Sequence, residues 1–142
     1  MAKRKTGALQ APAVVMLDVV DLITGKLNEL EGIEFARDAW ENKAPDQYGV
    51  VTLALEPIVQ YADGHLIDEI NRCTVDMYTE GSSDTWPALV REKLAELEDV
   101  NDWLDLSCRL TAREYLFDIN KVHWTMQINF AGPVIRTVSA GG

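Results

Sequence analysis

The segment from Cys73 to Phe130 constrains the fold of this chain more than any other part. Residues 74–79 have the composition of a strand and lead into a polar turn at 81–84. Two segments of alternating apolar and polar residues, 103–112 and 121–130, predict two further strands. Between the turn and these strands, apolar residues recur at helical spacing, at Trp86, Leu89, Val90, Leu94 and Leu97.

The preceding part of the chain predicts one more helix and three more strands. The helix is expected from Pro12 or Ala13 to Leu30, with Gly32 in a left-handed position after its end. Its apolar stripe comprises Met16, Val19, Val20, Ile23, Leu27 and Leu30. Strands are expected at 33–40, 50–56 and 67–79, with a reversal at Asp63–Gly64 before the last.

These elements predict an α+β fold in the order α-β-β-β-α-β-β. Two amphipathic helices need an apolar sheet face to cover, so we expect a two-layer sandwich with both helices on one face. The sheet is expected to have about five mostly antiparallel strands. A chain of 142 residues suits one domain. We assign residues 1–11 to a flexible basic arm, 12–131 to the domain and 132–142 to a C-terminal tail.

The charge of the chain argues against nucleic-acid readout. It has 13 basic and 23 acidic residues, and three of the basic ones lie at positions 3–5. Such an acidic body repels phosphate backbones. No apolar run is long enough to cross a membrane, and Lys3-Arg4-Lys5 is not followed by the apolar stretch of a signal peptide, so secretion is not expected.

The sequence nominates no catalytic, cofactor or metal site, and we do not expect an enzyme. His65 and His123 belong to no spaced metal motif, and no nucleophile elbow or phosphate-binding glycine loop is found. Asp68, Glu69 and Asp76 are interpreted as solvated charges. The two cysteines, Cys73 and Cys108, are isolated in the sequence and are expected to be small buried hydrophobes in a protein that folds in a reducing compartment.

The third strand carries apolar residues at positions of both parities, which predicts that both of its faces are covered. Ile70 and Tyr78 fall on one side, and Cys73, Val75 and Met77 on the other. The simplest cover for the second face is another subunit. The alternative is a tail or loop of the same chain.

Four features together resemble the tail terminator (tail completion) proteins of long-tailed bacteriophages, over residues 12–130. They are the long N-terminal helix ending near Gly32, the proline-containing loop before a strand pair, the strand 73–79 followed by Asp84 and a helix, and the strand 121–130 with His123–Trp124. In that family a valine-x-leucine-tyrosine-threonine type of strand commonly precedes the second helix.

The resemblance implies a structural virion protein without catalytic activity. Such a protein assembles in the host cytoplasm into a ring, typically a hexamer, on the head-proximal end of the tail tube. The ring stops tube growth and joins the tail to head and neck connector proteins. Double-stranded DNA passes through its channel without specific binding, and an acidic wall suits that passage. We expect Tyr61, Asp63 and His65, with Ile70 and Tyr78, to contact a neighbouring subunit or the tail tube protein.

Two other function classes stay open. One is another head–tail joint, such as a neck or head-closure protein, or a tail tube subunit. The other is a small cytosolic α+β ligand-binding domain or enzyme that uses an acidic pocket. A protein that stays monomeric and has a deep pocket favours this last class, whereas a ring with a central hole favours the first ones.

Overall fold

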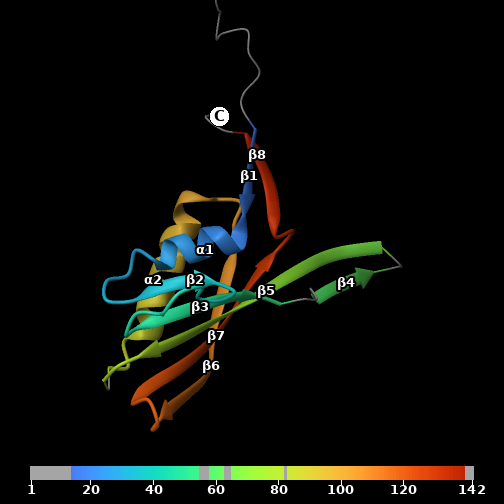
Figure 1. Cartoon of the computed structure of the whole chain (residues 1–142). Helices are drawn as coiled ribbons and strands as arrows, with labels where there is room; N and C mark the ends of the chain where they lie inside the picture. The colour runs from blue at the N-terminus through green and yellow to red at the C-terminus, as the bar shows by residue number, and fades with distance from the viewer. Residues whose placement is uncertain (1–13, 55–57, 63–64, 82, 140–142) are drawn as a thin grey trace, which may run out of the picture.

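The computed structural model describes residues 14–54, 58–62, 65–81 and 83–139. Within these residues the protein is α+β, with two helices and a mostly antiparallel main sheet (Figure 1). In chain order the elements are β1 (Val14–Asp18), α1 (Val19–Leu27), β2 (Glu34–Arg37), β3 (Tyr48–Leu53), β4 (Ile58–Ala62), β5 (His65–Thr79), α2 (Trp86–Val100), β6 (Leu106–Leu116), β7 (Lys121–Ala131) and β8 (Ile135–Ser139).

The main sheet is organised around the long strand β5. Five of its six strands lie in the order β2-β3-β5-β7-β6, with β2 and β3 parallel and the other pairs antiparallel. β5 has 15 residues and pairs along one edge with two strands, β3 opposite residues 73–78 and β4 opposite residues 65–70. The β4–β5 hairpin therefore extends beyond the rest of the sheet (Figure 1).

Strand β7 shows how the sheet builds the core. Its residues alternate between half-buried and buried over 121–130, as the sequence predicts. The buried side chains of β7 join those of β3, β5, α1 and α2 in one hydrophobic cluster. The largest of them, Trp124, donates an indole hydrogen bond of 2.9 Å to Oγ1 of the buried Thr79. The indole N–H of Trp124 therefore has a hydrogen-bond partner inside the core.

The expected start of the first helix is wrong. Residues 14–18 form strand β1, and α1 begins only at Val19. Asp18 sets this boundary because its Oδ1 accepts hydrogen bonds from the backbone N–H groups of Val20 and Asp21, at 2.9 and 3.2 Å. The apolar stripe is correct after this point, since Val19, Val20, Ile23 and Leu27 are buried. Pro12 and Ala13 lie outside the described residues.

The segment after residue 131 also differs from expectation. Residues 135–139, expected to belong to a tail, form strand β8, which pairs antiparallel with β1 in a separate two-stranded sheet. The β-branched residues of β1 favour a strand once such a partner is present. With β4, these two strands extend the expected element order.

The remaining elements lie close to their predicted positions. Helix α2 buries Val90, Leu94 and Leu97 along the predicted stripe. Gly32 has a φ of +82°, the left-handed conformation expected after the first helix. Strand β6 begins at Leu106, three residues later than expected. No helix in the described part of the chain is both long and apolar enough to cross a membrane.

Candidate interaction surfaces

The sheet face opposite the buried side chains of β5 and β7 is polar, which corrects the expectation of an apolar second face. The alternation of β5 sends Cys73, Val75 and Met77 to the core. The opposite row carries Ile70 and Tyr78 at its ends and Arg72, Thr74 and Asp76 between them. In register beside this row, β7 presents His123, Thr125, Gln127 and Asn129. Two apolar residues at the ends of a row do not make an apolar face.

A row of stacked rings crosses this polar face at one end. Tyr48, Tyr78 and His123 are in register on β3, β5 and β7. The ring centroids of the two tyrosines are 4.8 Å apart, and those of Tyr78 and His123 are 4.4 Å apart at an interplanar angle of 9°. Trp40 contacts Tyr48 edge-on, and the Lys121 ammonium lies 5.4 Å from the centre of the same ring. All three rings of the row are half-buried.

Asp76 fixes the histidine of this row. His123 Nε2 lies 2.7 Å from Asp76 Oδ1, and the Thr125 hydroxyl donates to the same oxygen at 3.2 Å. Burial, with further contributions from the charges of Asp76 and Tyr48, raises the pKa of the Tyr78 phenol. The phenol therefore stays neutral and can donate a hydrogen bond to a partner. A histidine–carboxylate pair needs a positioned nucleophile or substrate site to act in acid–base catalysis.

The structure does not bring all of the predicted contact residues together. Tyr78 lies in the aromatic row, whereas Ile70 lies eight positions away on β5, opposite Ala131 of β7. The backbone of Tyr61 and His65 belongs to the β4–β5 hairpin, and their side chains lie outside the described residues, as does all of Asp63. The antiparallel pairing of β4 with β5 fits the reversal expected near residues 63–64, whereas the strand β4 itself was not predicted.

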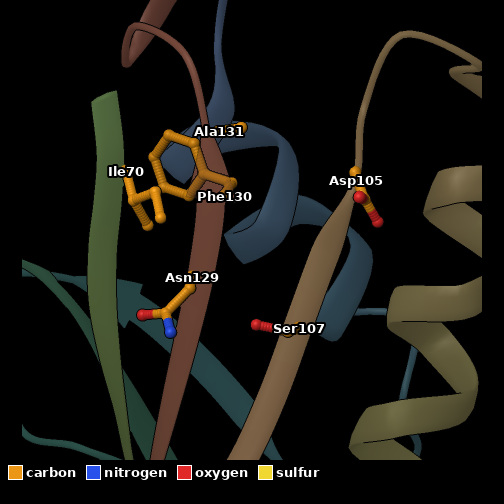
Figure 2. A pocket seen from close by; sticks show the side chains of 6 residues that line it. All are labelled: Ile70, Asp105, Ser107, Asn129, Phe130 and Ala131. Atoms are coloured by element: carbon orange, nitrogen blue, oxygen red, sulfur yellow. The ribbon is translucent and has the colours of Figure 1, made fainter. Parts of the chain in front are cut away.

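Several shallow hollows lie on the described surface, and two of them contain polar side chains of the sheet and its loops. Figure 2 shows the first, of about 230 Å³, where Ile70 and Phe130 lie above Asn129 and the facing Ser107. The second, of about 490 Å³, lies between the end of α1 and the loop before β3 and includes Glu34, Asp46 and Glu80. The first is smaller than the roughly 300–1,000 Å³ of most small-molecule sites, and both are open to solvent.

The turn between β6 and β7 exposes apolar side chains. Phe117 is 83% exposed, and Tyr115 and Ile119 are also exposed. Tyr115 and Phe117 contact each other edge to face at a centroid distance of 4.8 Å. The Tyr115 hydroxyl reaches Asn120 Oδ1 at 3.3 Å, and Asn120 closes the turn with a φ of +52°. We call residues 115–119 the β6–β7 tip. The sequence contains a signal for it, because apolar residues flank the polar turn residues Asp118 and Asn120.

The β1–β8 ribbon, formed by β1 and β8, exposes a second group of apolar residues. Val14, Met16 and Ile135 are 65%, 63% and 51% exposed. They share one face because β1 and β8 pair with Asp18 opposite Ile135 and Met16 opposite Thr137. An isolated two-stranded sheet is only marginally stable in water, so a partner that covers the apolar face of this ribbon would stabilise it.

Comparisons with known proteins give this chain no family. No protein-family model matches it, and no curated protein matches it. Among the described residues, no group of three or more His, Cys, Asp and Glu side chains is placed to hold a metal ion.

Proposed function

We propose that this chain is a structural virion protein of the tail terminator type. In this proposal it forms a ring on the head-proximal end of the tail tube, stops tube growth and joins the tail to head and neck proteins. One observation carries the proposal more than any other: the protein exposes apolar side chains on two projections, the β6–β7 tip and the β1–β8 ribbon. Exposed apolar groups that gather at one place often mark interaction sites.

The layers of the fold support the same proposal. We infer that the two helices cover one face of the sheet, which leaves the polar face for partners other than the chain itself. The row of Tyr48, Tyr78 and His123 would then meet the tail tube protein or a neck protein. Aromatic rings with polar edges are enriched at such interfaces. The β4–β5 hairpin is a further contact element on the same sheet.

The charge of the chain fits a ring that DNA passes through. Asp99, Asp102 and Asp105 are exposed around the connection from α2 to β6. We expect acidic side chains of loops or hairpin tips such as these to line the channel, because like charge keeps the duplex from binding. A map of the assembled ring with a positive channel potential would contradict this part of the proposal.

Assembly and tube growth test the proposal directly. Purified protein should form a ring with a central hole in negative-stain images. When added to polymerising tail tube protein of the same phage, it should shorten the tubes and lie at one end of each. A ring that leaves tube length unchanged and lies at no tube end would instead indicate another head–tail joint.

The second hollow is the observation that favours a small ligand-binding domain or enzyme. Its lining includes the acidic residues Glu34, Asp46 and Glu80. The Gln47 side chain donates to Gly32 O at 2.7 Å and accepts from the Glu80 N–H at 2.9 Å. This alternative predicts a monomer that is stabilised by a small cationic ligand. A thermal-shift screen measures the melting temperature of the protein with a series of cations and amines. If none of them raises the melting temperature, this alternative is contradicted.

A further inference from the structure

We propose that the β6–β7 tip of one copy docks on the β1–β8 ribbon of the next copy, and that this contact closes the ring. The inference rests on the proposed function and names the two surfaces that meet at each subunit junction. The occupant of the ribbon is thus a second copy of this chain. Its contact residues are Phe117 and Ile119 on the tip and Val14, Met16 and Ile135 on the ribbon.

The distribution of exposed apolar side chains singles out these two surfaces. Eight large apolar side chains among the described residues are strongly exposed. Three lie on the tip and four on the ribbon, and the eighth is Val100 at the end of α2. The apolar surface is therefore concentrated at two sites rather than scattered, as single exposed residues normally are.

The two surfaces lie at opposite ends of the molecule. In Figure 1 the β1–β8 ribbon lies at the top and the turn between β6 and β7 at the bottom. Strand β7, with 11 residues, runs between them and spans roughly 35 Å at the usual rise of a strand. The tip cannot reach the ribbon of its own chain, so a contact between them joins different copies. A contact between unlike surfaces repeats from copy to copy and closes into a ring when the rotation allows.

The ribbon face that carries Val14, Met16 and Ile135 is suited to an apolar partner. The one acid on this face, Asp18, is already engaged, because Arg37 lies 3.0 Å from its Oδ2. Thr137 directs its hydroxyl to the Met16 sulfur at 3.0 Å. On the tip, the contact of Tyr115 with Phe117 holds the rings in place before docking, which lowers the entropy cost of binding.

The areas agree with one junction per copy. With residue areas of about 150–220 Å², the exposed fractions of the five contact residues sum to roughly 600 Å² of largely apolar surface. At about 60% apolar area this corresponds to an interface of about 1,000 Å², which is the size of a small or transient complex. A head-to-tail junction covers the tip and the ribbon of every copy. A two-fold contact of two tips would leave both ribbons exposed.

Disulfide crosslinking tests which surfaces meet. In a Cys108→Ala background, Asp118→Cys is combined with Thr137→Cys in one chain, so that Phe117 and Met16 are retained. Oxidation should give a ladder of crosslinked chains on a non-reducing gel. Each single variant should stay uncrosslinked, and so should a control chain that carries Asp118→Cys with Glu92→Cys on the exposed side of α2. A dimer formed by Asp118→Cys alone indicates tip-to-tip contact and overturns the inference.

Assembly measurements separate this inference from the proposed function. Phe117→Ser should raise the concentration for half-assembly about tenfold or more. Val100→Ser, at a residue of similar exposure at the end of α2 and outside the proposed contact residues, should change it less than about twofold. Rings that form without crosslinks and are insensitive to Phe117→Ser overturn the inference and leave the proposed function standing. A wild-type protein that stays monomeric contradicts both.

Discussion

Gly49 on β3 is required by the packing of a single ring. A Cβ atom at this position would collide with the ring of the buried Phe35 and lie 3.3 Å from the backbone oxygen of Asp76. Gly49→Ala should therefore lower the free energy of unfolding by about 1–3 kcal/mol, the usual cost of overpacking a core. Urea denaturation measures the change.

Gly25 provides the matched control for this substitution. It lies in α1, and a Cβ there meets no atom within 4 Å. Gly25→Ala should raise the free energy of unfolding by up to about 1 kcal/mol, because alanine favours the helix. Equal effects of the two substitutions would show that close packing does not explain Gly49.

Tyr78 should titrate at a higher pH than a free tyrosine. Its pKa is raised above the ordinary value of 10.0, first by burial and then by the charges of Asp76 and Tyr48. A raised folded pKa contributes stability that is complete below pH 10 and is lost as the pH rises through the folded value. Ultraviolet absorbance of tyrosinate should show a late transition that Tyr78→Phe removes and Asp76→Asn moves to lower pH. An unchanged titration curve in both variants would contradict the assignment.

At the scale of elements, the start of α1 depends on one side chain. Asp18 ends β1, accepts hydrogen bonds from two free N–H groups of the helix and pairs with Arg37. Asp18→Ala should lower the free energy of unfolding by about 1–2 kcal/mol through the lost cap. Asp18→Asn keeps the cap and loses only a partly exposed ion pair, so it should cost less than about 1 kcal/mol. Urea denaturation measures both changes. If the two variants lose the same free energy of unfolding, the ion pair with Arg37 and not the cap accounts for the effect.

The periodicity of the sequence predicts those elements that bury one face against the core. β7 and α2 are examples, because each alternates or repeats over many residues beside a stable partner. β1 could not be predicted, since Val14 to Asp18 continue the helical stripe of α1. Their strand conformation depends on pairing with β8, and the residues of β8 lie more than 115 positions further along the chain. Local patterns carry no information about such a distant partner.

The candidate surfaces were predictable only in part. The sequence predicts Tyr78 as one of two apolar residues on a face, whereas in the structure it stacks in a row with Tyr48 and His123. That row depends on the register of three strands, which the sequence does not determine. Cys73 is buried as predicted, and burial raises its pKa to about 12. Cys108 lies two strands away, roughly 10 Å, which is too far for a disulfide.

At the scale of the whole molecule, the position of the exposed apolar surface determines how copies of the protein are expected to assemble. The main sheet has one face in the core and one polar face, so neither demands another subunit. The exposed apolar side chains that favour contact with another subunit lie on the β6–β7 tip and the β1–β8 ribbon, at opposite ends of the protein (Figure 1). Two complementary ends on one chain favour repeated assembly over a closed dimer.

The mass of the purified protein in solution tests this central claim most directly. Mass photometry, or light scattering on a size-exclusion column, should give one closed oligomer, expected to be a hexamer, that dissociates when Phe117 is replaced by Ser. The wild-type protein should show no further growth with concentration, because a ring has no free ends. A wild-type protein of 15.9 kDa at every concentration would contradict the account.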